Sequence, residues 1–308
     1  GPNAPAEAQA VAMRACSLAR SAGADDLVAI GTARVAALAH ALGDSVAAEE
    51  GFEAALSGLR GAGALREEGR TLAALARVHA ERGRPLRAQA LHEQALSLVR
   101  EVGDQIGEVN ELDALAGLLS ERGDLEQAET VWGEALTVVR AAGDRQLEAR
   151  VAAHAAVGAR RAMQGEAARV DLLRALELAR EVQDRRTQVL LMGQIGELDL
   201  TLGHLPAARA SLLRAIAGAE RLRAADLEGP SRGALGELLA VLGELEQGRE
   251  QLRRGRALLE GAHRRTDLVE LLERHAEVEA AAGDHEAADA LLQAAAEAGE
   301  LSQLDGWA

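Results

Sequence analysis

Apolar residues recur at helical spacing along almost the whole chain, in segments of about 17 residues separated by short polar stretches. Leu112, Leu115, Leu118 and Leu119, for example, fall on one face of a helix. No segment shows the alternation with period two that a half-buried strand requires. The pattern therefore predicts an all-α protein of some fifteen antiparallel helices.

Glycines mark the ends of these segments about every twenty residues. Glycine is favoured just past a helix end because the chain there often turns through positive φ. Aspartates that follow several of these glycines are expected to cap the next helix. The two alternating series of stops predict two helices in each unit of about forty residues. The first series is Gly43, Gly83, Gly123, Gly165, Gly203, Gly243 and Gly283, and the second begins Gly23, Gly63, Gly103 and Gly143.

The segments 83–122 and 123–162 are two copies of one unit, since Ala88, Ala95 and Arg100 in the first match Ala128, Ala135 and Arg140 in the second. Self-similarity at a fixed period is the signature of a repeat architecture. We name the helix after each glycine of the first series the second-type helix of its pair. The helix after each glycine of the other series is a first-type helix.

Two columns of small residues run through the second-type helices, with a column of larger residues between them. Small side chains at two successive turns allow close approach of the neighbouring helices. The first column is Ala48, Ala88, Ala128, Ala168, Ala208, Gly248 and Ala288, and the second is Ala55, Ala95, Ala135, Ala175, Ala215, Gly255 and Ala295. The large residues expected to fill the core between them are Phe52, His92, Trp132, Leu172, Leu212, Leu252 and Leu292.

The order small, large, small at offsets 0, +4 and +7 resembles the tetratricopeptide repeat, whose usual period is about 34 residues. The longer period, with the endings VREVGD and VRAAGD, is similar to the variant found in kinesin light chains and in bacterial signalling regulators. This resemblance implies an α-solenoid of antiparallel helix pairs, with about seven repeats in a right-handed superhelix. The sequence departs from the family by lacking the first-helix aromatic residue and the terminal proline.

Residues 1–3 resemble a remnant of an expression tag and are set apart. The first helix is a second-type helix without its partner, which favours a longer native protein over a cap. Gly229 and Pro230 are expected to interrupt the helical pattern over 223–232. We therefore expect N-terminal repeats over 4–228 and C-terminal repeats over 229–308, with a tail that folds back on the last helix and partly buries Trp307.

The composition excludes several classes of chemistry. All 34 basic residues among the 308 are arginine, so there is no lysine for a phosphate loop or a Schiff base. Cys16 is the only cysteine, which excludes an intrachain disulfide and favours a reducing cytoplasm. The net charge of −15 argues against direct nucleic-acid binding, and no apolar run has the length of about 18 residues that crosses a bilayer. The absence of lysine and tyrosine, with abundant Ala, Gly, Arg and Leu, suggests a GC-rich bacterial genome.

No residue pattern predicts catalysis, a cofactor or a metal. His285, Glu286 and Asp289 come nearest to a metal motif, and they are better explained as the capped start of a helix. His79 and His92 are expected to form a hydrogen-bonded packing pair. The arginine column that includes Arg60 and Arg100 is expected to complement helix dipoles and to pair with the following cap aspartates. The sequence therefore predicts a protein that is not an enzyme.

In the resembling family, first-type helices line a concave surface that binds partner segments. The residues that this places in the groove run from arginine-rich to uniformly acidic, ending at Glu237, Glu273 and Glu277, which suits a partner read by charge and hydrogen bonds. The predicted partner-binding residues are Arg70, Arg77, Asn110, Asp113, Arg150, His154, Arg160, Gln194 and Glu197, with Ser120 nearby.

The resulting hypothesis is a protein-interaction module that binds a protein or peptide segment, as a scaffold or regulatory region of a larger bacterial signalling protein. One alternative is a small-molecule sensor that gates an attached enzyme or DNA-binding domain, which would need an apolar pocket with a few polar anchors. Another is homo-oligomerisation through the end helices.

Overall fold

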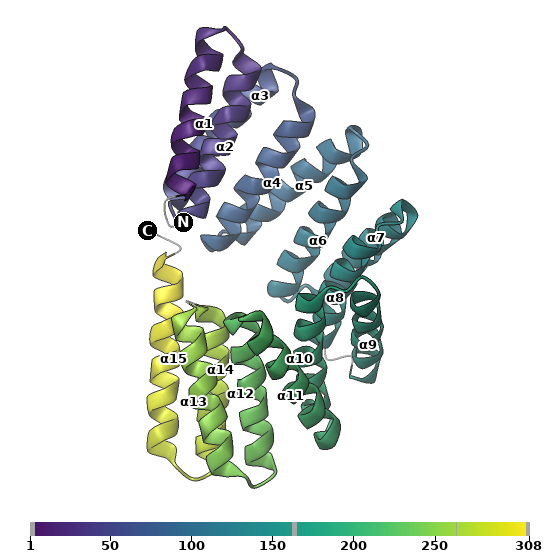
Figure 1. The fold of residues 1–308 in the computed structure, drawn as a ribbon, viewed down its shortest axis with the longest axis vertical. Coiled ribbons are helices and arrows are strands. Elements are labelled where there is room, and N and C mark those ends of the chain that lie inside the picture. The colour runs from purple at the N-terminus through teal and green to yellow at the C-terminus, as the bar shows by residue number, and fades with distance from the viewer. Residues whose placement is uncertain (1–3, 162–164, 263, 306–308) are drawn as a thin grey trace. The chain divides into compact units, whose positions relative to one another are not determined.

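The computed structural model describes residues 4–161, 165–262 and 264–305, which form fifteen α-helices and no strand (Figure 1). The helices are α1 (Ala4–Ser21), α2 (Asp25–Ala41), α3 (Ser45–Gly61), α4 (Leu65–Glu81), α5 (Pro85–Glu101), α6 (Gln105–Glu121), α7 (Leu125–Ala142), α8 (Arg145–Arg161), α9 (Glu166–Glu181), α10 (Arg185–Thr201), α11 (Leu205–Leu222), α12 (Ala225–Val241), α13 (Leu245–Gly261), α14 (Arg265–Ala281) and α15 (His285–Asp305).

The helices form two compact units, one containing α1–α7 and the other α8–α15. In the first unit, α2, α4 and α6 are the first-type helices, and each packs against the second-type helix that follows it. In the second unit, α8, α10 and α12 pack in the same way on α9, α11 and α13. Neighbouring first-type helices also contact one another within each unit. The prediction of an α-solenoid built from antiparallel helix pairs is confirmed, whereas the handedness of the superhelix stays a prediction.

Helix ends follow the glycine series. Gly43 and Gly123 adopt φ values of 86° and 85°, which a side chain would make costly. Where the second series has no glycine, Gln183 and Arg223 still take left-handed φ values of 57° and 52°. The turn geometry is therefore imposed by the repeat and not by glycine alone. Asp44 and Asp104 cap α3 and α6 as expected, but Asp124 makes no side-chain cap and instead pairs with Arg122 at 3.1 Å.

The predicted small columns are buried from the first hairpin to the last. The larger residues between them are buried too, except Leu292, whose side chain is 50% exposed. The prediction for Leu292 is wrong because, within the described residues, no helix beyond α15 packs on that face. His92 occupies its core position by donating or accepting a hydrogen bond between Nδ1 and Oε2 of Glu111, at 2.7 Å.

The helix α12 passes without a break through Gly229 and Pro230, so the predicted interruption is wrong. Pro230 removes the N–H that would bond the Asp226 carbonyl, which by itself weakens a helix. Packing on α10, α11, α13 and α14 compensates for this loss. The compact units divide between Gly143 and Asp144, while position 229 lies inside a packed helix. The predicted burial of Trp307 falls outside the described residues.

Glycine brings α12 and α13 together where other hairpins have alanine. A Cβ atom on Gly248 would lie 2.6 Å from the carbonyl oxygen of Gly236, and one on Gly255 would lie 2.8 Å from that of Gly229. These distances are too short for any side chain, so the two backbones touch directly. Gly229 and Gly236 of α12 therefore form part of the contact surface of this hairpin.

His79 is fully buried, and neither ring nitrogen has a hydrogen-bond partner within the described residues. The expected hydrogen bond with His92 is therefore wrong, because His92 pairs with Glu111. Burial lowers the pKa of His79 below its ordinary value of 6.5. The Glu49 carboxylate, 3.8 Å from Nε2, opposes this shift only in part, and Arg84 and Arg87 add to it.

We predict that the free energy of unfolding decreases as the pH falls below 6.5, the ordinary pKa of histidine. The unfolded chain then binds a proton at His79 that the folded chain excludes, so protonation favours unfolding. Urea titrations at several pH values should show a shallower pH dependence for His79→Leu than for the wild type. The exposed His285→Ala variant is the control, and an equal slope in all three proteins would contradict the assignment.

Candidate partner-binding surface

Two sets of ion pairs join successive helices. In the first set, Arg60 donates through Nε to Glu68 and Arg100 donates to Glu108, each at 2.7 Å. The predicted pairing with the cap aspartates is wrong for these two arginines. Each guanidinium extends past the N-cap residue and reaches a glutamate in the first turn of the next helix. The hydrogen bond that Arg100 donates to Glu108 raises the pKa of Arg100. Arg60 and Arg100 therefore belong to the framework.

The second set joins the start of a second-type helix to the end of the next first-type helix. Arg169 donates to the buried Asp199 at 2.6 Å, and Arg249 donates to the buried Glu279 at 2.9 Å, thirty residues further along the chain in both cases. The hydrogen bond from Arg249 lowers the pKa of Glu279. Buried carboxylates with such partners are costly to disturb. These residues are also framework.

On the first unit, the predicted residues divide between surface and core. Arg70 and Arg77 are exposed on α4, and Arg70 donates to Glu67 at 2.8 Å. Asn110 is half-buried on α6. Asp113 is only 8% exposed and accepts a hydrogen bond from Nε1 of Trp132 at 3.0 Å. The expectation that Asp113 and Ser120 face solvent is wrong, because both are buried where α6 packs on its neighbours.

On the second unit, Arg150 and His154 are exposed on α8, and each already interacts with another residue. Gln194 is half-buried on α10, and Glu197 is buried. The side chain of Arg160 lies outside the described residues. Arg70 and Asn110 belong to the first unit and Arg150 to the second, so a row that joins all three stays a prediction.

The sequence interpretation missed Arg274 on α14. Its Nη1 donates to Oε2 of Glu237 at 2.5 Å. Burial lowers the pKa of this guanidinium, but the carboxylates of Glu197, Glu237 and Glu270 outweigh burial, so the pKa is raised. The prediction that the groove residues are uniformly acidic towards the C-terminus is therefore wrong. Arg274 occupies the same repeat position as Gln194, and this spacing was the signal that could have found it.

Arg34 on α2 was also missed. It aligns with Ala74, one turn before Arg77 on the adjacent first-type helix α4. Arg34 and Arg77 are both exposed, and neither makes an ion pair within the described residues. We call the surface formed by Arg34, Arg77 and the small residues Ala37, Ala74, Ala114 and Gly117 the first-helix face. A Cβ atom on Gly117 would meet nothing within 4 Å, so this surface is open.

The described residues contain no group of three or more His, Cys, Asp or Glu side chains placed to hold a metal ion. Among the same residues, no helix is both long and apolar enough to span a bilayer.

No family model and no curated protein matches this chain. Several solved structures, however, are similar to it. Aspartyl phosphate phosphatase F from Bacillus subtilis is 14% identical, with a TM-score of 0.80 over 93% of this chain and 74% of its own. The Rap conjugation gene regulator of the plasmid pLS20, in complex with a Phr peptide, is 14% identical, with a TM-score of 0.67 over 92% of this chain and 77% of its own.

A signal transduction ATPase with a tetratricopeptide repeat sensor from Pyrococcus horikoshii is 16% identical, with a TM-score of 0.61 over 89% of this chain and 44% of its own. This chain has the tetratricopeptide-type repeat fold. At such low identities the tetratricopeptide-type likeness establishes architecture alone, so function has to be argued from the residues of this chain.

The hydrogen bond between Asp113 and Trp132 predicts a structural cost. We expect Asp113→Ala to lower the free energy of unfolding by about 1–3 kcal/mol, because it leaves the buried indole N–H without its acceptor. Asp113→Asn keeps an oxygen acceptor and should cost less. Denaturant titrations would measure both variants, with the exposed Asp289→Ala as the control. A loss no larger than that of the control would show that the bond contributes nothing.

Proposed function

We propose that this protein is a non-catalytic interaction module that binds an extended, acidic peptide segment on its first-helix face. The observation that carries the proposal is that Arg34 and Arg77 are exposed without an ion-pair partner in the described residues, whereas the arginines of the framework sets are neutralised. A side chain that the framework does not use is available to a partner.

The local geometry fits a peptide. The helices α2 and α4 are in contact, and axes of packed helices lie about 8–10 Å apart. Guanidiniums on two adjacent helices can bind carboxylates on one extended segment. Charge-assisted hydrogen bonds contribute about 1.5–3 kcal/mol each. The alanine and glycine positions around them would let the peptide backbone approach the helices closely.

The structural comparisons support this class of function. One similar structure holds a Phr peptide, and another similar repeat array is described as the sensor of a signal transduction ATPase. By analogy, we infer that this chain is a regulatory or scaffolding region in a bacterial cytoplasmic signalling system. Arg70, Asn110, Arg150, His154, Arg160 and Gln194 are proposed to extend the binding surface, each within its own unit, whereas the buried Glu197 is left out.

Selection from a random peptide library tests the proposal without knowledge of the native partner. Peptides selected by the wild-type protein should be enriched in Asp and Glu. Their affinity for the Arg34→Ala/Arg77→Ala variant should fall at least about tenfold, which corresponds to the loss of one charge-assisted contact. Fluorescence anisotropy would measure the affinity, and binding should weaken with added salt.

Arg174→Ala provides the matched control. Arg174 is exposed on the second-type helix α9 and makes no ion pair within the described residues, so its loss changes the net charge without touching the first-helix face. The affinity of this control should equal that of the wild type. Selected peptides without acidic enrichment, or equal affinity for the double variant, would refute the proposed surface.

A further inference from the structure

A pocket of about 630 Å³ lies between the first half of α10 and the second half of α11. Its apolar lining includes Val189, Met192, Leu213 and Leu222. Leu213 is 49% and Leu222 41% exposed, so apolar surface is open to water here. The polar lining consists of Gln188 and three arginines, Arg185, Arg214 and Arg221, with no carboxylate.

The pocket exists because position 218 is glycine. A Cβ atom there would lie 2.4 Å from Cγ2 of Val189, so glycine lets α11 approach α10 and places no side chain over the groove between them. Other second-type helices carry a larger residue at the equivalent position. These residues are Leu98, Val138, Leu178 and Leu258.

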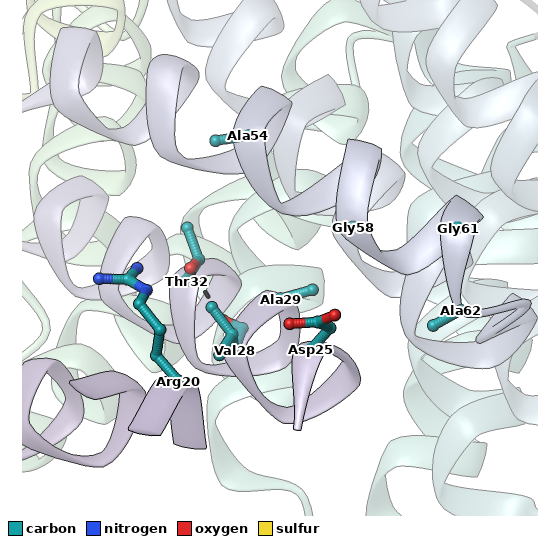
Figure 2. A pocket seen from close by; sticks show the side chains of 9 residues that line it. All are labelled: Arg20, Asp25, Val28, Ala29, Thr32, Ala54, Gly58, Gly61 and Ala62. Carbon is teal, nitrogen blue, oxygen red and sulfur yellow. Dashed lines mark hydrogen bonds between the residues drawn. The ribbon is translucent and has the colours of Figure 1, made fainter. Parts of the chain in front are cut away.

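Gly58 is the equivalent glycine in the first unit, and a second pocket of about 680 Å³ accompanies it (Figure 2). Most of its lining residues occupy the same repeat positions as those of the α10–α11 pocket, 160 residues earlier in the chain. The chemistry differs, however. Asp25 stands where the other pocket has Arg185, and Ala54 stands where it has Arg214. Figure 2 shows Arg20 and Asp25 as its two charged side chains, so this pocket has no excess charge.

The carboxylates within four residues of this lining along the chain have other partners, and among them Asp184 accepts hydrogen bonds from Thr187. Glu181 accepts from Arg145 at 2.6 Å, and Glu220 accepts from Arg232 at 2.7 Å. Asp226 pairs with Arg186. Arg221 donates through Nε to the Ala217 carbonyl at 2.8 Å, and Arg185 and Arg214 make no ion pair within the described residues. The three arginines of the pocket therefore lack a counter-charge there.

We propose that the α10–α11 pocket is a site for a small carboxylate with an extended apolar tail, such as a medium-chain fatty acid. The tail would cover Val189, Met192, Leu213 and Leu222, and the carboxylate would accept hydrogen bonds from the arginines. Small-molecule sites have volumes of about 300–1,000 Å³ and combine apolar walls with a few polar anchors. A protein segment fits less well because ten residues of one hairpin line the pocket, whereas stable interfaces use about 20–30 residues a side.

This site is separate from the first-helix face, and the inference does not depend on the peptide proposal. It gives the fold a second ligand class, selected by the charge of the three arginines and by the apolar lining. The pocket near Gly58 acts as an internal comparison, because it has the same repeat position and a similar volume without the three arginines.

Isothermal titration with decanoate below its micelle concentration tests the site. Decanoate should bind with a Kd on the order of 0.1 mM, as expected for a ligand of this size. Decanol lacks the charge and acetate lacks the tail, so each should bind at least about tenfold more weakly. The Arg185→Ala/Arg214→Ala variant should lose at least about tenfold in decanoate affinity while its melting temperature stays unchanged, because both side chains are exposed.

Arg174→Ala is the charge-matched control and should bind decanoate like the wild type. Hydrogen exchange should show decanoate-dependent protection within 185–222 and none within α2 and α3. Equal affinity for the double arginine variant, equal binding of decanol, or protection at the Gly58 pocket would overturn the proposal. So would the absence of decanoate binding alongside protection of 185–222 by an acidic, leucine-containing peptide, since the occupant would then be a protein segment.

Discussion

Close contact between helices at alanine and glycine positions is the constraint on which the rest of this structure depends. The chain has one phenylalanine and no tyrosine, so the core cannot be filled by aromatic bulk. Ala88, Ala128 and Ala208 are buried instead where the helices of each pair meet, and leucines such as Leu172 fill the layer between the small columns. Dense packing of small side chains brings the backbones near each other, and the glycine contacts between α12 and α13 are the extreme case. Gly218, where most other second-type helices carry a larger residue, leaves a surface hollow.

Electrostatic pairing forms the second layer of the framework. The repeat places arginines of one helix opposite carboxylates of the next, as in Arg60 with Glu68 and Arg249 with Glu279. With an acidic chain of net charge −15, most arginines find such a partner by default. Among the exposed arginines that do not, Arg34 and Arg77 lie on the first-helix face and Arg214 lines the α10–α11 pocket, whereas Arg174 belongs to neither surface. An anionic ligand requires a cation that has no partner within the fold. The first-helix face and the α10–α11 pocket both offer such cations and differ mainly in the apolar groups around them.

The repeat period, the helix pairs and the small columns could all be predicted from the sequence, because each follows from local periodicity. The prediction that Leu292 is buried was wrong because its burial depends on a neighbouring helix and not on the local sequence pattern. The predicted helix interruption at Pro230 was wrong because tertiary packing outweighed the local helix-breaking effect of proline. Asp113 was assigned to the surface although Trp132, nineteen residues away, holds it in the core. Arg34 could have been found by extending the same offsets to α2, but its lack of a partner is a fact about the folded chain. The pocket at Gly218 required knowing which helices lie side by side.

Chemical modification of the arginines most directly tests the central claim, that ion pairing and not exposure makes the framework arginines unavailable to a ligand. The chain has no lysine, which simplifies the reaction with phenylglyoxal and its readout by peptide mass spectrometry. Arg60, Arg145 and Arg186 are paired yet 53%, 54% and 59% exposed, so they are the matched reference. Arg34, Arg77, Arg185 and Arg214 should react several-fold faster than these three. Equal rates across the two groups would contradict the account.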